Sequence, residues 1–136
     1  MSQARLVIDA SAVVALLADD GPAGRWVTAS VAGADLAAPE LMPYEAANIL
    51  RRQELAGVLD PTAASLAHRD LTALPLQLCP YAPLAARAWE LRRALTTYEA
   101  SYVALAELLG APLVTLDARL GRALGPRCSV LAYGGP

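Results

Sequence analysis

Short apolar runs alternate along the chain with segments of helical periodicity, and this alternation constrains the fold more than any other feature. Runs typical of strands cover residues 4–8, 35–38, 76–78, 112–116 and 128–132. Segments typical of helices cover residues 11–18, 21–31, 40–56, 61–73, 82–95, 98–109 and 117–123. Strands that are each followed by a helix form parallel sheets with helices on both faces. We therefore predict an α/β fold with a central parallel sheet.

Two of the expected helices carry clear apolar stripes. The stripe of segment 82–95 consists of Leu84, Ala88, Leu91 and Leu95. The next helix has Thr97 as its expected N-cap and Gly110 as its end, and its stripe consists of Tyr98, Tyr102, Leu105 and Leu109. Residues at these spacings share one helix face. Both helices are predicted to bury these stripes against the core.

The length of 136 residues suits one domain, which we expect to span residues 1–136 with a frayed tail at 134–136. The longest uncharged stretch, residues 71–86, is too short to span a bilayer and contains three prolines. The start of the chain lacks the apolar run of a secretory signal, so we expect a cytoplasmic protein without membrane contact. The isolated Cys79 and Cys128 are predicted to be buried thiols.

The residue types that the chain lacks exclude several kinds of chemistry. All 11 basic residues are arginines, which excludes a Walker A loop and Schiff-base catalysis because both require lysine. His68 is the only histidine and has no partner at ligand spacing, so neither a zinc site nor a serine–histidine pair is indicated. The net charge of −2 provides no broad basic surface for nucleic acid. Carboxylates, hydroxyls and arginines remain for chemistry.

Four acids fall where the predicted fold gathers side chains. Asp9 ends the first strand and Asp117 follows the strand at 112–116, while Glu45 and Glu99 lie near the starts of their helices. The carboxyl ends of parallel strands form the usual crevice of such sheets. Each acid has a structural interpretation as a helix N-cap or first-turn acid. If all four acids meet, however, their mutual repulsion requires a cation.

A hard divalent ion such as Mg²⁺ or Mn²⁺ prefers the oxygen ligands that these acids supply. Such an ion binds a phosphate oxygen and lowers the pKa of a bound water, which allows that water to attack phosphorus. This chemistry needs neither histidine nor lysine. The alternative from the residues alone is a small-ligand α/β domain in which the four acids serve only as caps, and it predicts no Mn²⁺ binding.

Several motifs, taken together, resemble the successive motifs of PIN domains, and more narrowly of VapC-like ribonuclease toxins of type II toxin–antitoxin modules. They are Val7-Ile8-Asp9-Ala10-Ser11, Glu45 with Asn48, the segment Tyr98 to Ala106, and Thr115-Leu116-Asp117-Ala118-Arg119-Leu120. The likeness extends over nearly the whole chain in order and spacing. It implies a three-layer α/β/α fold, an endoribonuclease dependent on Mg²⁺ or Mn²⁺, a homodimer, and inhibition by a cognate VapB-like antitoxin.

By position, the resemblance makes Asp9, Glu45, Glu99 and Asp117 the catalytic and metal-binding residues. Family members usually have aspartate where this chain has Glu99, which keeps the charge and adds one methylene. Ser11 and Thr115 match small hydroxyl positions and are expected to orient carboxylates or metal-bound water, or else to make capping and turn hydrogen bonds. Asn48, the only asparagine, shares the helix face of Glu45 and is expected at the site.

Arginines are the candidate phosphate contacts, because an acidic site needs a cationic rim to accept RNA. The candidates are Arg51, Arg52, Arg92, Arg93, Arg119 and Arg122, each of which is otherwise a solvated helix residue or part of a surface ion pair. A structured RNA with an exposed loop is the expected substrate. A second hypothesis is a non-catalytic PIN-like module that binds RNA or protein, in which Glu99 has made the acidic site degenerate.

Overall fold

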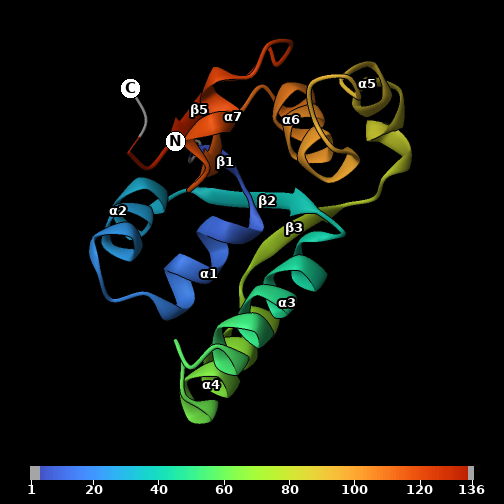
Figure 1. The fold of residues 1–136 in the computed structure, drawn as a ribbon. Helices are drawn as coiled ribbons and strands as arrows, with labels where there is room; N and C mark the ends of the chain where they lie inside the picture. Colours follow the sequence, from blue (N-terminus) through green and yellow to red (C-terminus); the bar gives the residue numbers. More distant parts are fainter. Residues whose placement is uncertain (1–3, 135–136) are drawn as a thin grey trace.

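The computed structural model describes residues 4–134 as a parallel sheet between helices (Figure 1). Its strands are β1 (Arg5–Ile8), β2 (Asp35–Pro39), β3 (Leu76–Cys79), β4 (Leu113–Thr115) and β5 (Val130–Ala132). Its helices are α1 (Ala10–Ala18), α2 (Pro22–Val31), α3 (Met42–Leu55), α4 (Pro61–Ala73), the 3₁₀ helix η1 (Ala82–Leu84), α5 (Ala85–Glu90), α6 (Thr97–Leu109) and α7 (Ala118–Arg122). Apart from the segment 82–95, these bounds agree with the sequence prediction within two residues.

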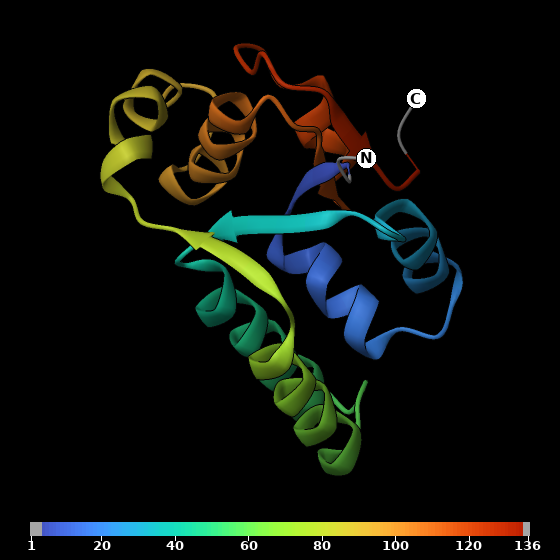
Figure 2. The ribbon, with the colours of Figure 1, turned by 180° about the vertical axis from the view of Figure 1, so that it is seen from behind.

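The strand order is β3-β2-β1-β4-β5, and every neighbouring pair is parallel. Figure 2 shows β3 at the sheet edge beside β2. In the centre, Val7 of β1 is in register with Leu113 of β4, and Ile8 with Val114. All four of these side chains are fully buried, as expected for strands that are covered on both faces. The predicted parallel sheet is confirmed.

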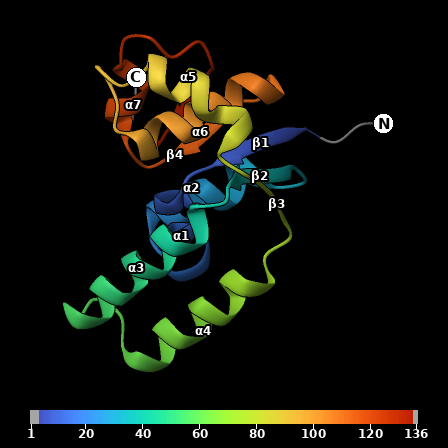
Figure 3. The same cartoon turned by 90° about the vertical axis from the view of Figure 1, so that its right-hand side faces the viewer.

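Helices cover both faces of the sheet. Helix α6 packs on β1, β2 and β4, and it carries α5 and η1 on the same side. Helix α1 packs on the opposite face together with α2, α3 and α4. Helices α3 and α4 lie side by side and extend away from the sheet (Figure 3). The three-layer α/β/α architecture is therefore also confirmed.

The continuous helix predicted over residues 82–95 is wrong. The chain forms η1 and α5 and then turns over residues 91–94, where the Arg92 guanidinium caps the carbonyl of Trp89 at 2.9 Å. The apolar stripe is nevertheless buried, because the turn keeps Leu91 and Leu95 facing the core. The turn also lets α6 begin immediately and pack back against α5.

Two details of α6 differ from the prediction. Thr96, not Thr97, is the N-cap, and it forms a capping box with Glu99. Tyr102 and Leu105 are buried as expected, but Tyr98 is 62% exposed because it lies in the first turn, beyond the edge of the sheet.

Residues 135 and 136 of the expected tail lie outside the described residues. Within residues 4–134, no helix has the length and apolar character needed to cross a membrane.

Candidate metal-dependent active site

The acidic site begins where β1 and β4 end side by side. Asp9 follows Ile8, and Asp117 follows β4 after one intervening residue. Both are N-caps: Asp9 accepts a hydrogen bond from the Ala12 N–H at 2.9 Å, and Asp117 accepts one from the Arg119 N–H at 2.9 Å. The capping interpretation is thus correct for both residues, and it does not compete with a site at this edge.

Asp9 is the most constrained carboxylate, with 8% of its surface exposed. Its Oδ1 accepts from the Ser11 hydroxyl at 2.7 Å, and its Oδ2 accepts from the Thr115 hydroxyl. Burial raises the pKa of Asp9 above its ordinary value, and the negative charge of Asp117 acts in the same direction, while the hydrogen bonds from Thr115, Ser11 and the Ala12 N–H partly offset the shift.

Ser11 and Thr115 also connect this carboxylate to the β4 end. The Ser11 hydroxyl accepts from the Leu116 N–H at 3.2 Å, and the Thr115 hydroxyl accepts from the Asp117 N–H at 2.9 Å. Each hydroxyl therefore donates to Asp9 and accepts from the backbone that leads to Asp117. This arrangement fixes the donor direction of both hydroxyls toward Asp9.

Glu45 lies in the first turn of α3 and accepts a hydrogen bond from the Tyr102 hydroxyl at 2.6 Å. Burial raises the pKa of Glu45, and the charges of Asp9 and Glu99 add to this shift, against the hydrogen bond from Tyr102. Burial and the adjacent Glu45 also raise the pKa of Tyr102, so its hydroxyl stays protonated and donates. Sequence reasoning placed Tyr102 in the core and missed this contact, which no spacing signal reveals.

Glu99 divides its two oxygens between two functions. One accepts from the Thr96 N–H at 2.9 Å and completes the capping box, and the other binds the guanidinium of Arg119. The same Arg119 nitrogen lies 3.0 Å from Asp117 Oδ2. Arg119 was predicted to contact phosphate, but in the structure its guanidinium bridges two of the four acids.

One cleft of about 370 Å³ brings the predicted residues together. Its lining includes all four predicted acids, along with Ser11, Asn48, Arg52, Tyr98 and Tyr102. Thr115 lies below this lining, fully buried, and reaches the cleft through Asp9. The cleft therefore joins the ends of β1 and β4 to the starts of α3 and α6, as the sequence predicted.

Comparison with known proteins fits this architecture. The PIN domain family model matches residues 6–124. This chain belongs to the PIN domain family. Among curated relatives, ribonuclease VapC9 of Mycobacterium tuberculosis is 37% identical over 125 residues, which is 92% of this chain and 95% of the relative. Ribonuclease VapC12 of the same species is 32% identical, with 92% and 96% covered.

Solved structures give the same fold. PAE2754 from Pyrobaculum aerophilum superimposes with a TM-score of 0.64 at 30% identity, over 88% of this PIN domain and 85% of that chain. A VapBC2 structure from Rickettsia felis, bound to a DNA fragment from the promoter of its genes, superimposes with a TM-score of 0.67 at 12% identity, over 95% and 98% of the two chains. The second likeness concerns the fold alone.

The donor set of the cleft suits a hard divalent ion, since it consists of carboxylate oxygens with hydroxyls behind them. Burial of Asp9 and Glu45 among like charges is also unfavourable unless a cation is present. Within residues 4–134, however, no three acidic, histidine or cysteine side chains are grouped tightly enough to hold an ion together. The guanidinium of Arg119 accounts for part of this, because it holds Glu99 and Asp117.

The other predicted arginines are distributed unevenly around the cleft. Arg52 lines it. Arg92 stacks on the Trp89 ring at 4.7 Å, and neither it nor the exposed Arg51 and Arg93 is part of the cleft lining. Arg122 is also exposed on α7. Of the six candidates, Arg52 and Arg119 are therefore the ones placed beside the acids.

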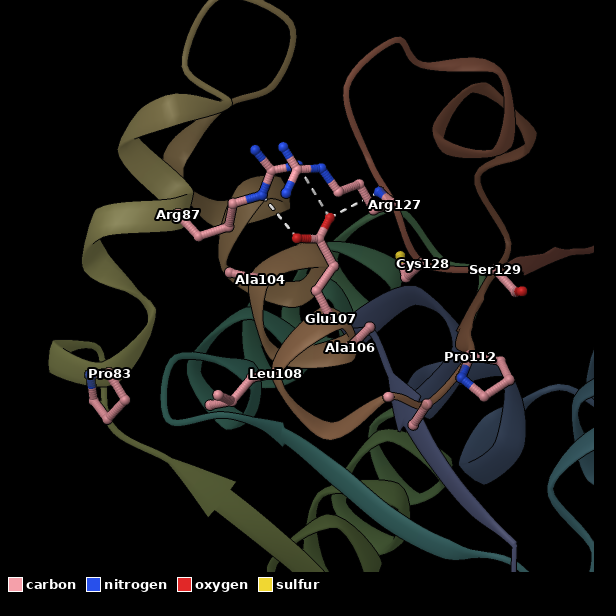
Figure 4. A pocket seen from close by; sticks show the side chains of 12 residues that line it. Pro83, Arg87, Ala104, Ala106, Glu107, Leu108, Pro112, Arg127, Cys128 and Ser129 are labelled. Carbon is pink, nitrogen blue, oxygen red and sulfur yellow. Dashed lines mark hydrogen bonds and ion pairs between the residues drawn. The ribbon is translucent and has the colours of Figure 1, made fainter.

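A cavity of about 670 Å³ lies elsewhere, between α5, α6 and the segment before β5 (Figure 4). Its carboxylate is already neutralised, because Glu107 accepts from the Arg87 guanidinium at 2.7 Å and from the Arg127 backbone N–H at 2.8 Å. We therefore do not assign the active site to it. Cys128, on its wall, is half-buried, as is Cys79 on β3, so the prediction of buried thiols holds only in part.

Proposed function

We propose that this PIN domain is the toxin of a type II toxin–antitoxin module and hydrolyses RNA phosphodiesters in the presence of Mg²⁺ or Mn²⁺. The observation that carries the proposal is the single cleft in which Asp9, Glu45, Glu99 and Asp117 meet from four separate parts of the chain. Relatives that carry the name VapC ribonuclease and match nearly the full length support it.

In this proposal the four acids would hold the ion, and Glu99 and Asp117 would be free to do so once Arg119 no longer bound them. A bound ion would supply a site for a phosphate oxygen and would lower the pKa of a water, so that the water could lose a proton and attack phosphorus. The hydroxyls of Ser11 and Thr115 keep the Asp9 oxygens in place, and the Tyr102 hydroxyl does the same for Glu45. Arg52, together with Arg119 once it has left the acids, contacts the phosphate backbone, and Asn48 contacts the substrate or water.

Cleavage assays with EDTA and with Asp9→Asn test this function. We expect EDTA to abolish cleavage of a structured RNA, Mg²⁺ or Mn²⁺ to restore it, and Asp9→Asn to lower the rate by about 100-fold or more, because the buried ligand loses its charge. Asp70→Asn, which removes an exposed carboxylate of α4, is the matched control and should cleave normally. Cleavage that persists both in EDTA and in Asp9→Asn would overturn the proposal.

The contact of Arg119 with Glu99 and Asp117 favours a second candidate, a non-catalytic PIN-like module that binds RNA or protein through a degenerate site. Glu99→Asp separates the two. In a nuclease this substitution only adjusts an existing activity. In the non-catalytic module it creates cleavage where the unmodified chain shows none. Because Glu99 also completes the capping box, Thr96→Ala serves as the control for loss of that cap alone.

The proposed partners are an RNA substrate, a cognate VapB-like antitoxin and a second copy of the chain, all in the cytoplasm. The Rickettsia felis structure, described as VapBC2, contains both proteins of such a module. Isologous dimers are the commonest oligomers. We expect the product of the neighbouring gene to copurify with this chain and to stop cleavage, and light scattering of the isolated chain to give the mass of a dimer.

A further inference from the structure

A second cavity lies beside the acidic cleft and differs from it in chemistry. It measures about 490 Å³ and is formed by the ends of β2 and β3 with the starts of α3 and α6. Tyr98 lines both cavities, so the two are contiguous at the carboxyl edge of the sheet. Its volume falls within the range of about 300–1,000 Å³ that is typical of small-molecule sites.

Three exposed tyrosines line this cavity. Tyr44 is 81% exposed, Tyr98 62% and Tyr81 47%, and Leu41 and Leu84 supply an apolar floor. Exposed apolar side chains that lie together around one cavity mark a binding site, whereas scattered ones do not. The three tyrosines come from three different elements, because Tyr44 lies in α3, Tyr81 follows β3 and Tyr98 lies in α6.

We propose that this cavity is a subsite for an unpaired nucleobase of the RNA, an inference that rests on the proposed nuclease function. A base is joined to its phosphate through a single sugar, so a base subsite must adjoin the acids, as this cavity does through Tyr98. Unpaired bases stack on aromatic side chains, whereas bases in a duplex are already stacked. With a net charge of −2, the chain also needs a source of RNA affinity other than charge.

Glu40 gives the subsite a polar acceptor. It lies at the end of β2, lines the same cavity and is exposed, and its backbone N–H is bonded to the Cys79 carbonyl at 2.8 Å, which fixes its position. A carboxylate accepts hydrogen bonds from the exocyclic amino groups of adenine, cytosine or guanine, whereas uracil offers only its N3–H, which lies between two carbonyl oxygens that repel the carboxylate. The cavity should therefore disfavour uracil.

Binding of labelled RNA to the Asp9→Asn protein tests the subsite without cleavage. The probes are a fluorescein-labelled 15-nucleotide single strand of randomised sequence and the corresponding duplex, measured by fluorescence anisotropy in Mg²⁺. Tyr98→Ala should weaken single-strand binding by about five- to 150-fold, the range expected for one lost stacking partner. Tyr98→Phe should restore it, and duplex binding should stay unchanged.

Trp89→Ala is the matched control, because Trp89 is equally exposed at 63% but lines neither cavity. A single strand with 5-iodouridine or 5-iodocytidine at one position should crosslink to Tyr98 or Tyr44, and the cytidine form should do so more efficiently. Equal single-strand affinity of Tyr98→Ala and the parent overturns the inference.

The alternative occupant is a second copy of the chain. In that case Tyr44→Ala and Tyr98→Ala convert a dimer to a monomer in light scattering and weaken single-strand and duplex binding alike, which also overturns the inference. Failure of the proposed function gives a different result. A wild-type chain that neither binds nor cleaves RNA contradicts both proposals. A wild-type chain that cleaves RNA, with tyrosine variants that bind single strands as tightly as the parent does, contradicts only the base subsite.

Discussion

The ionised form of Asp9 is favoured by its hydrogen bonds but disfavoured by its burial, and without a cation these two effects oppose each other. Its hydrogen bonds to Ser11, Thr115 and the Ala12 N–H fix both oxygens, yet its burial next to Asp117 disfavours the ionised form. The folded-state pKa of Asp9 is therefore raised above the unfolded value, as is that of Glu45. A carboxyl of this kind adds stability below its unfolded pKa, and this contribution is lost as pH rises through the folded pKa.

We therefore expect Asp9→Asn to stabilise the metal-free protein at pH 7. Asparagine imitates the protonated acid in size and keeps an oxygen for the Ala12 N–H. The melting temperature in EDTA should rise by a few degrees, since 1 kcal/mol shifts it by about 2–8 °C in domains of this size. This gain in melting temperature should vanish below the pKa that Asp9 has in the unfolded chain, where the parent carboxyl is also uncharged. Calorimetry at pH 7 and pH 3.5 measures both values, and a variant that melts lower than the parent at pH 7 would contradict the explanation.

Arg119 is the residue whose replacement should tighten metal binding. Its guanidinium neutralises Glu99 and Asp117 and must leave before both oxygens face an ion. Because the side chain is exposed, the effect is modest, and we expect Arg119→Ala to bind Mn²⁺ about two- to fivefold more tightly in titration calorimetry. Arg122→Ala removes a nearby charge from the same helix and should leave the affinity unchanged. Weaker Mn²⁺ binding in Arg119→Ala would show that Arg119 assembles the acids.

The predictability of the site differs from residue to residue. Asp9 and Asp117 were predictable, because the end of a strand fixes where the next side chain lies. The contact between Tyr102 and Glu45 was not, because it depends on the packing distance between α6 and α3. The Arg119 bridge was also missed, since a long flexible side chain carries no periodicity that reports its direction.

At the scale of elements, α1 and α2 are so close that Gly24, in the first turn of α2, has no room for a side chain. A Cβ there would lie 1.7 Å from the backbone oxygen of Asp19. The absence of a side chain at this position is thus what lets the start of α2 approach the end of α1.

Gly24→Ala should lower the free energy of unfolding by about 3 kcal/mol or more, above the usual effect of overpacking, because backbone rather than a flexible side chain must move. Gly121→Ala is the control, since its Cβ would meet only ordinary contacts with Val130 and should be neutral or stabilising. Urea unfolding of the three proteins measures the differences. Equal stability of both variants would indicate that α2 shifts freely.

Element prediction succeeded where one rule decides an element and failed where tertiary contacts decide it. Asp60 followed by Pro61 fixed the start of α4, and Gly110, at a φ of 62°, ended α6. The break after Glu90 was not predictable from the stripe, because Leu91 and Leu95 stay buried in a helix and in a turn alike.

At the scale of the whole molecule, one ionic network attaches the segment before β5 to the α5–α6 layer. Arg87 binds both Glu107 oxygens and donates to the Gly125 carbonyl at 2.8 Å. Burial acts to raise the pKa of Glu107, but hydrogen bonds from Arg87 and the Arg127 N–H outweigh it and lower the pKa. The stability from this carboxylate is present above its unfolded pKa and is lost as pH falls through the folded pKa.

Arg87→Met should therefore lower the free energy of unfolding at pH 7 by about 1–3 kcal/mol, because it leaves a largely buried carboxylate without its guanidinium. The difference from the parent should shrink on acidification, once Glu107 is protonated. Hydrogen exchange should speed up at residues 123–129 and stay unchanged in α3. Arg69→Met, on exposed α4, is the control. A penalty that does not depend on pH would contradict the network.

The central pairing of β1 with β4 determines when the acidic cleft is completed during synthesis. The pairing brings Asp9 next to Thr115, which lies 106 positions further along the chain, so Asp9 acquires Thr115 and Asp117 as neighbours only after β4 has been made. A ribosome-bound or prematurely terminated product that stops before β4 lacks Thr115 and Asp117, so its acidic cleft is incomplete. In the proposed nuclease, no RNA can therefore be cleaved before the segment that carries Thr115 and Asp117 has been translated and has packed against β1.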